Sequence, residues 1–182
     1  GSRQSEVQKL LPEMLVAAKR IEEKLNPVQY VLPLADTLDR AYISHILAQH
    51  PVKVRLIGGE TYDVINCADI AIVASGTATL ETALMETPMI VIYKVSKTSY
   101  YIGKMIINVN NIGLVNIIAG KTIVPELIQD EANPERIADE VISILENRER
   151  LEWIKTELSK IRGMLGSPGA ADRAARLAYA MQ

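Results

Sequence analysis

The segment 74–78, Ala-Ser-Gly-Thr-Ala, has the residue types in this sequence that are best suited to hold a phosphate. It follows the apolar run 69–74 and precedes a stretch with helical spacing, so it is predicted to lie at the turn from a buried strand into a helix. Ligands of open α/β sheets bind outside the carboxyl ends of the strands, and free amides at a helix N-terminus favour phosphate. Gly76 would let the backbone approach a ligand closely, and the amides of Thr77 and Ala78 would point outward at the helix N-terminus. Glu81, one turn later, could reach a ribose hydroxyl pair. The alternative is an ordinary helix capped by Ser75 or Thr77.

Three further places in the sequence have residues that could contact a ligand. Gly58-Gly59 follows a predicted strand and could hold a nucleobase edge, or it is an ordinary strand-to-helix turn. Arg3 offers a planar fork suited to a diphosphate, although a terminal arginine is usually solvated. Asn116 lies in the apolar stretch 112–119 and is either a satisfied loop anchor or a ligand contact. The acidic residues of 126–131 are expected to form a solvated face.

Metal and hydrolase chemistry have little support in this sequence. Cys67 is the single cysteine, which excludes an internal disulfide and a multi-cysteine metal site. His45 and His50 have no paired ligands and are interpreted as structural or surface residues. We expect no metal, and no Ser-His-Asp arrangement is recognisable.

The composition indicates a globular domain with an aliphatic core. The chain has 182 residues, 48% of them hydrophobic and none of them phenylalanine. Its net charge of -2 argues against a nucleic-acid partner, which would need a clustered basic face. No run approaches the roughly 20 apolar residues of a membrane-spanning helix.

Strand-like and helix-like segments alternate four times in the first half of the sequence. Strands are predicted over 28–34, 52–57, 69–74 and 89–95, and helices over 5–25, 36–49, 60–67 and 77–86. This alternation predicts a Rossmann-like, doubly wound parallel sheet. Such a domain normally begins with a strand, whereas this sequence opens on a helical segment, so we expect the first strand to be missing or to lie in another polypeptide.

The second half is predicted to be mainly helical. Helices are expected over 99–109, 134–146, 151–165 and 170–181, with a loop at 110–113. Asp36 and Asn133 are predicted N-caps, Pro134 a first-turn residue, and Pro12 a marker for the start of the first regular helix. We predict a ligand-binding domain at 1–147 and a helical extension at 148–182.

Spaced motifs across nearly the whole chain resemble the lipid-A-disaccharide synthase family. They are Gly1-Ser2-Arg3-x-Ser5-Glu6-Val7, the segment 74–81, Pro88-Met89 with Tyr93-Lys94, the segments 116–120 and 124–129, and the tail Gly166-x-Pro168-Gly169-Ala170-x-x-Arg173. The resemblance implies the C-terminal, donor-binding half of a GT-B glycosyltransferase, whose first strand this chain lacks. The implied reaction joins UDP-2,3-diacylglucosamine to 2,3-diacylglucosamine 1-phosphate, with no cofactor, and the other half supplies acceptor contacts and the general base.

Carried over by motif, the resemblance implies roles for individual residues. Arg3 would face the diphosphate or the departing UDP, and Asn116 would sit at the mouth of the cleft; both are the implied catalytic residues. Ser75, Gly76 and Thr77 would cradle phosphate. Glu81 would hold the ribose, and Gln129 is a lesser candidate for donor binding. The family often has arginine at the position of Lys94. A lysine keeps the positive charge but cannot form the bidentate hydrogen bonds of an arginine, so a role for Lys94 is in doubt.

The resemblance also implies a cellular setting and partners. The lipid substrates imply a cytoplasmic protein attached to the inner face of the bacterial inner membrane, with 102–118 as a possible surface patch or as core. The missing N-terminal domain is an implied partner, and residues 150–182, deprived of it, would exchange between two chains in a swapped homodimer. The alternatives are a UDP-GlcNAc 2-epimerase, an undecaprenyl-linked glycosyltransferase or a non-catalytic UDP-binding module.

Overall fold

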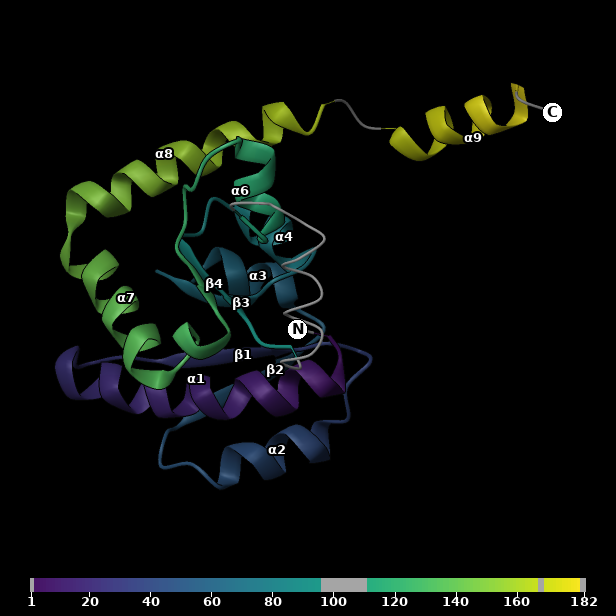
Figure 1. Cartoon of the computed structure of the whole chain (residues 1–182). Coiled ribbons are helices and arrows are strands. Elements are labelled where there is room, and N and C mark those ends of the chain that lie inside the picture. Colours follow the sequence, from purple (N-terminus) through teal and green to yellow (C-terminus); the bar gives the residue numbers. More distant parts are fainter. Residues whose placement is uncertain (1, 96–110, 167–168, 181–182) are drawn as a thin grey trace.

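The computed structural model describes residues 2–95, 111–166 and 169–180, which form alternating strands and helices (Figure 1). The strands are β1 (Tyr30–Leu34), β2 (Val54–Gly58), β3 (Ala71–Ala74), β4 (Met89–Tyr93) and β5 (Glu126–Ile128). The helices are α1 (Gln4–Lys24), α2 (Arg40–Ala48), α3 (Thr61–Asn66), α4 (Ala78–Leu84), α6 (Leu114–Ala119), α7 (Pro134–Glu146), α8 (Arg148–Met164) and α9 (Ala170–Ala180), with a 3-10 turn, η1, at Gln129–Glu131.

All the strand pairs among the described residues are parallel, but they form two sheets. One sheet has the order β1-β2, and the other has the order β3-β4-β5. The predicted Rossmann-like α/β fold is thus confirmed in its strand direction and its alternation. β1 and β3 each keep one edge without a strand partner among the described residues.

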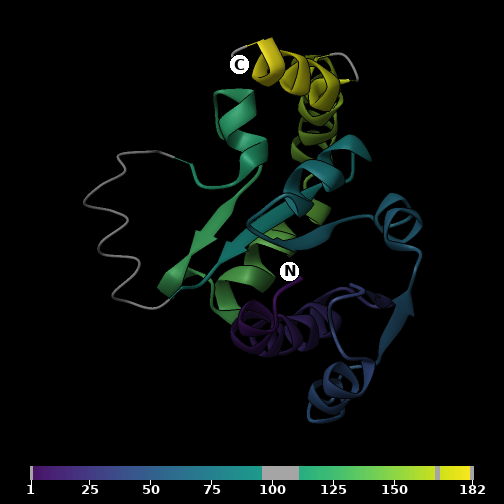
Figure 2. The same ribbon diagram turned by 90° about the vertical axis from the view of Figure 1, so that its right-hand side faces the viewer.

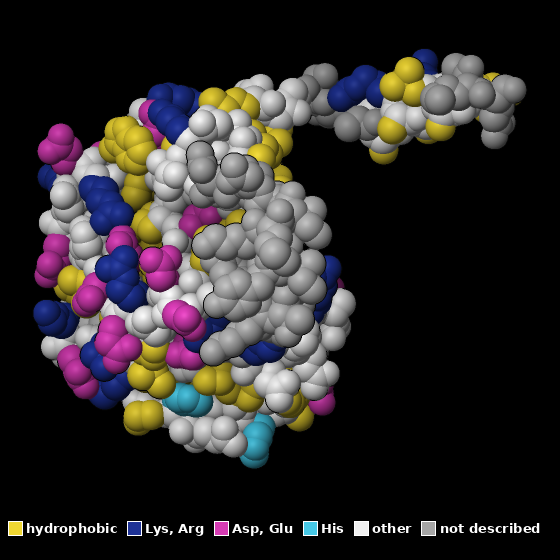
Figure 3. Space-filling model, in the orientation of Figure 1, with side chains coloured by type: hydrophobic (Ala, Val, Ile, Leu, Met, Phe, Trp, Pro, Cys, Tyr) yellow, Lys and Arg dark blue, Asp and Glu magenta, His cyan; other side chains and the backbone are white. Residues whose placement is uncertain are grey.

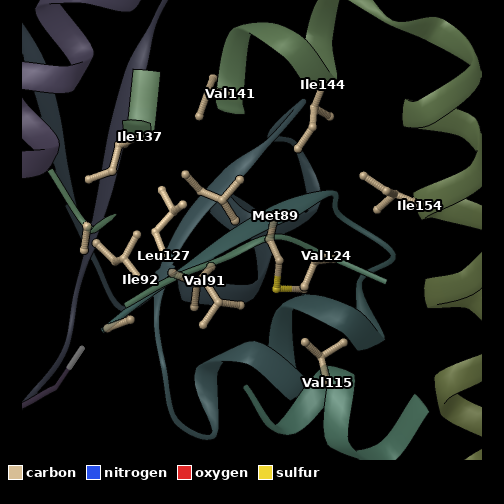
Figure 4. Packing of buried hydrophobic residues seen from close by; sticks show 14 of the residues in the cluster. Met89, Val91, Ile92, Val115, Val124, Leu127, Ile137, Val141, Ile144 and Ile154 are labelled. Carbon is tan, nitrogen blue, oxygen red and sulfur yellow. The ribbon is translucent and has the colours of Figure 1, made fainter. Parts of the chain in front are cut away.

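Strand β4 is the centre of the main core. It lies between β3 and β5, and Met89, Ile90, Val91 and Ile92 are completely buried. Figure 4 shows residues of α7 on one side of these strands and Val115 of α6 on the other. A strand covered on both faces needs apolar residues at every position, which explains the unbroken run at 89–92.

Helix α1 packs on both sheets. Leu10, Ala17 and Ile21 belong to the main core with β3 and β4. The other stripe of α1, led by Leu11 and Leu15, packs on β1, β2 and α2 in a second cluster. Because the apolar residues recur three and four apart, one helix presents two adjacent stripes.

A hydrogen bond from Tyr30 connects β1 to α1. Its hydroxyl donates a hydrogen bond to the Ala18 carbonyl oxygen at 2.6 Å. Burial, followed by the negative charge of Glu22, raises the pKa of Tyr30 to about 12. The phenol therefore stays neutral and keeps its donor over the physiological pH range.

Some helix ends differ from those predicted. Asp39, not Asp36, caps α2, because its carboxylate accepts from the Ala41 amide at 2.8 Å. Helix α1 already begins at Gln4 and continues through Pro12, so the prediction of a start near the proline is wrong. The predicted Asn133 cap of α7, with a first-turn proline, is confirmed by its bond from the Arg136 amide at 2.9 Å.

Helix α8 belongs to the core. Ile154, Leu158 and Ile161 are buried with α4, α6 and α7. The expectation that residues from 150 onward lack a packing surface is therefore wrong for this helix. The Glu157 carboxylate lies 2.8 Å from the Lys121 ammonium and 2.7 Å from that of Lys160. These hydrogen bonds, Lys121 first, lower the pKa of Glu157.

Helix α9 stands away from the rest of the described chain (Figure 1). Its side chains from 171 to 179 are exposed, among them Leu177 and Tyr179. Figure 3 shows apolar and basic side chains side by side on this tail. Within the described residues, no helix is both long enough and apolar enough to cross a membrane. The predicted helix at 99–109 lies outside the described residues.

Candidate functional site

A pocket of about 520 Å³ lies where the start of α1 meets the carboxyl ends of β3 and β4. In Figure 2 the N-terminal end of the chain lies close to these strands. The pocket is lined by Arg3, Ser5, Glu6, Lys9, Ser75, Tyr93, Lys94, Val95 and Ile112. It thus occupies the strand edge at which open α/β sheets bind ligands, as the sequence predicts.

The pocket is rich in positive charge. Arg3, Lys9 and Lys94 line it, whereas Glu6 is the one carboxylate among the lining residues. Arg3 contacts Glu6 at 3.2 Å in an exposed pair, which is weak and easily exchanged for a ligand. Lys94 is held by Glu13 of α1. Lys9 is exposed and has no ion pair with any other residue in the described ranges, and neither its type nor its spacing singled it out in the sequence.

Ser75 lines the pocket, but its hydroxyl is occupied. Its Oγ donates to the Ile112 carbonyl oxygen at 3.1 Å, and its amide donates to Ile92 at 3.0 Å. The first backbone bonds of α4 are donated by Thr79 and Leu80, so the amides of Thr77 and Ala78 lie ahead of the helical ladder. Thr77 occupies the cap position without a side-chain cap. Gly76 and Thr77 are not lining residues of the pocket. Phosphate binding at this turn stays a prediction, and it would depend on the backbone amides rather than on the Ser75 hydroxyl.

Glu81 lies on α4 and is half-buried. It is not a lining residue of the pocket, and its carboxylate has no hydrogen bond or ion pair with another residue among those described. A carboxylate without such a partner is available for a ligand hydroxyl pair. The predicted ribose contact stays a prediction.

The glycine pair at the end of β2 is not brought to the pocket. Gly58 is the last residue of this strand, which belongs to the other sheet, Gly59 follows it, and neither lines the pocket. Gly59 has a φ of 80°, a left-handed conformation that favours glycine. The turn itself accounts for Gly59, and the predicted nucleobase contact is not supported by the pocket.

Gln129 does not line the pocket but forms hydrogen bonds to the backbone of a residue that does. Its Oε1 accepts from the Val95 amide at 2.8 Å, and its Nε2 donates to the Val95 carbonyl at 3.3 Å. Both ends of the side-chain amide therefore hold the backbone of a lining residue. This geometry positions the end of β4 and leaves direct donor binding by Gln129 a prediction.

Asn116 is completely buried and holds the loop beneath the pocket. Its Oδ1 accepts from the amides of Ile123 at 2.8 Å and Val124 at 3.1 Å. Its Nδ2 donates to the Val124 carbonyl at 2.9 Å and to Glu126 at 2.7 Å. All of its hydrogen-bonding capacity in this conformation is used inside the protein. Of the two interpretations of the sequence, this geometry favours the loop anchor over the catalytic contact.

Glu126 is the residue that the sequence interpretation missed. Its carboxylate accepts from the amides of Ile112 at 2.7 Å and Gly113 at 3.0 Å, in addition to Asn116. The expectation that Glu126 belongs to a solvated acidic face is therefore wrong. It fixes the backbone of Ile112, which lines the pocket.

These features define a Rossmann-like α/β domain with a pocket lined by cationic side chains at the carboxyl ends of its strands. The family model for Lipid-A-disaccharide synthetase matches residues 1–178, and the chain belongs to this family. The chain is similar to two proteins called lipid-A-disaccharide synthase. It is 57% identical over 182 residues to the one from Syntrophus aciditrophicus and 40% identical over 181 residues to the one from Geobacter sulfurreducens. The matches cover 100% of this chain in both cases, and 48% and 47% of the relatives. The chain thus spans about half the length of these relatives.

Proposed function

We propose that this chain is the donor-binding half of a lipid-A-disaccharide synthase and that its pocket holds the diphosphate of a UDP-sugar. The observation that carries the proposal is the cationic pocket, which contains Arg3 and Ser75 from two motifs of the family. A pyrophosphate carries charge of the opposite sign, and the planar guanidinium of Arg3 can donate hydrogen bonds to two of its oxygens at once. Family membership argues against the epimerase and undecaprenyl-linked alternatives.

The proposed reaction is a direct displacement at the anomeric carbon. The acceptor hydroxyl of 2,3-diacylglucosamine 1-phosphate forms a bond to this carbon, while the bond from the carbon to the β-phosphate oxygen breaks. The electron pair leaves with UDP, and the hydroxyl proton passes to a base in the other half. Arg3 and the amides of Thr77 and Ala78 would stabilise the developing negative charge, a task at which preorganised donors are effective. No cofactor takes part in this scheme.

The lipid substrates extend the proposal to the inner face of the bacterial inner membrane and to a partner. We propose that α9, whose Leu177 and Tyr179 are exposed, packs on a second copy of the chain in a swapped homodimer. Light scattering of the intact chain and of a chain ending at Gly166 tests this point. A dimer that becomes a monomer on truncation is expected, and a monomer in both cases would refute it. Sedimentation with vesicles containing anionic lipid tests the membrane contact.

Calorimetric titration with UDP tests the donor site. We expect saturable binding that weakens about tenfold or more in Arg3→Ala and in Glu81→Ala, because each removes a charged contact. Lys53→Ala is the matched control, since Lys53 is exposed and lies outside the pocket. It should bind UDP like the unaltered chain.

The result separates the possible outcomes. Equal loss in Arg3→Ala and Lys53→Ala would mean that only net charge matters, and the placement of the diphosphate would be wrong. Binding of UDP without any transfer, even when the other half is added, would leave a UDP-binding module and contradict the enzymatic proposal. Transfer of the diacylglucosamine on addition of that half would support it.

A further inference from the structure

Two residues that line the pocket, Val95 and Ile112, lie outside the strands and helices, and we call them the rim residues. The backbone of each is held by a side chain from β5 or from the residue that follows it. Glu126 accepts a hydrogen bond from the Ile112 amide at 2.7 Å. Gln129 accepts one from the Val95 amide at 2.8 Å and donates one to the Val95 carbonyl at 3.3 Å. One short strand therefore holds two separate parts of the pocket wall.

The strand β5 is itself fixed by the main core. Leu127 is 3% exposed and is paired in register with Ile92 of β4. Figure 4 shows Leu127 beside Val91 and Ile92. Because the core determines where β5 lies, side chains that leave it can determine the position of backbone that no sheet holds.

Gly113 leaves the space that the Glu126 contact needs. A Cβ atom at position 113 would lie 3.0 Å from Oε1 of Glu126 and 3.4 Å from Cγ2 of Val91. The φ of Gly113 is -75°, a value that any residue adopts, so the close approach and not the backbone conformation favours glycine here. A side chain at this position would displace the carboxylate from the amides that it binds.

Gln129 keeps its contact in an unfavourable backbone conformation. Its φ is 54°, in the left-handed region that residues with a Cβ atom seldom adopt. Such conformations persist where the surrounding contacts determine them, and they are frequent at functional sites. Glycine would suit this backbone but would lack the side-chain amide that holds Val95.

We propose that Glu126 and Gln129 are positioning residues of the pocket. Neither lines it; they hold the rim residues where an anionic ligand needs them. Ile112 in turn accepts from the Ser75 hydroxyl at 3.1 Å, so release of Ile112 would also disturb Ser75. A wall held in place before binding saves the ligand the cost of ordering it. The inference rests on the proposed function, because its ligand is the diphosphate of UDP.

Glu126→Gln distinguishes positioning from charge. Removal of a negative charge near a cationic pocket would, by charge alone, tighten the binding of UDP. A carboxamide has one oxygen where a carboxylate has two. Oε1 accepts from Gly113 and Asn116, whereas Oε2 accepts from Ile112, so the amide nitrogen should replace Oε2 and release Ile112. We expect UDP binding to weaken about threefold to tenfold, the equivalent of one lost hydrogen bond. Unchanged or tighter binding in calorimetry would overturn the role of Glu126.

Two further variants leave the charge of the chain unaltered. Gly113→Ala displaces the Glu126 carboxylate, and Gln129→Met keeps the length of the side chain but removes both hydrogen bonds to Val95. Each should weaken UDP binding to a similar degree. Ile144→Val is the control, because it removes a buried methylene from the main core and should lower the stability without changing the affinity. Equal weakening in this control would mean that general destabilisation is the cause and would overturn the proposal.

Amide exchange measured by NMR tests the same contacts without any nucleotide. The Ile112 amide should exchange about tenfold faster in Glu126→Gln, and the Val95 amide about tenfold faster in Gln129→Met. Faster exchange together with normal UDP affinity in these variants would overturn this inference and leave the proposed function intact. Absence of UDP binding by the unaltered chain would refute the proposed function and, with it, the role given to Glu126 and Gln129.

Discussion

Replacing Asn116 by alanine tests whether this residue is an anchor or a ligand contact. The substitution leaves the amides of Ile123 and Val124, both 1% exposed, without their acceptor. A buried donor without a partner costs about 1–3 kcal/mol. The Val124 carbonyl and the Glu126 carboxylate lose a donor as well. We therefore expect a loss of about 3–5 kcal/mol of unfolding free energy, a large part of the about 5–15 kcal/mol typical of a domain.

Urea unfolding followed by circular dichroism and by the fluorescence of Trp153 gives this free energy. Asn111→Ala is the matched control, because Asn111 accepts an exposed hydrogen bond from Thr122 at 2.9 Å. Its loss should cost less than about 0.5 kcal/mol. If Asn116→Ala were as mild as this control and the affinity for UDP fell instead, the anchoring argument would be refuted and the direct contact supported.

Substitutions at three further sites give expected outcomes. Tyr30→Phe should lower the unfolding free energy by about 1 kcal/mol at neutral pH. Because the folded pKa is raised from 10.0 to about 12, the stability from the neutral phenol is intact below pH 10 and lost as the pH rises through about 12. The variant should lose this alkaline dependence in urea titrations. Glu157 has a lowered pKa, so its contribution is present above its ordinary value of 4.5 and lost as the pH falls. Glu157→Gln should flatten the acid side of the stability profile, and an unchanged profile would contradict the ion pairs. Gln129 has a φ of 54°, so Gln129→Gly should destabilise less than Gln129→Ala by about 0.5–1 kcal/mol, although both lose the Val95 hydrogen bonds. Equal thermal stability of the two would rule out backbone strain there.

The strands that build the pocket could be predicted because their signal is local. The runs at 69–74 and 89–95 are apolar at successive positions, and the structure places β3 and β4 within them. The strand β5 was missed because it has only the three residues Glu126–Ile128 and begins with a charge. A short strand of this kind is defined by its pairing with β4, which no local pattern reveals.

The location of the site could be predicted from the sequence, but the residues that hold its backbone in place could not. The turn at 74–78 and Arg3 each carry a recognisable chemistry, and the structure brings Arg3 and Ser75 to one pocket. Lys9 was missed because an exposed lysine on a helix is ordinary. Asn116 and Glu126 depend on each other across a loop, and a polar pair buried by tertiary structure leaves no periodic signal. The same holds for the choice between Asp36 and Asp39 as a cap, which depends on where the turn before α2 ends.

The bridging position of α1 has a consequence for how the molecule opens. Among the residues that the structure describes, the cluster beneath its second stripe contains five buried hydrophobic residues, Val7, Leu11, Leu15, Ile43 and Ile46, whereas the main core is several times larger. The lobe formed by β1, α2 and β2 should therefore detach in a subglobal unfolding event at a lower free energy than the rest. Such an event would remove the packing from one side of α1, while α7 would still pack on its other side. The helix that carries Arg3 and Lys9 would then fluctuate with the least stable cooperative unit of the domain. The association and dissociation rates of any ligand in the pocket would therefore change at denaturant concentrations well below the global unfolding transition.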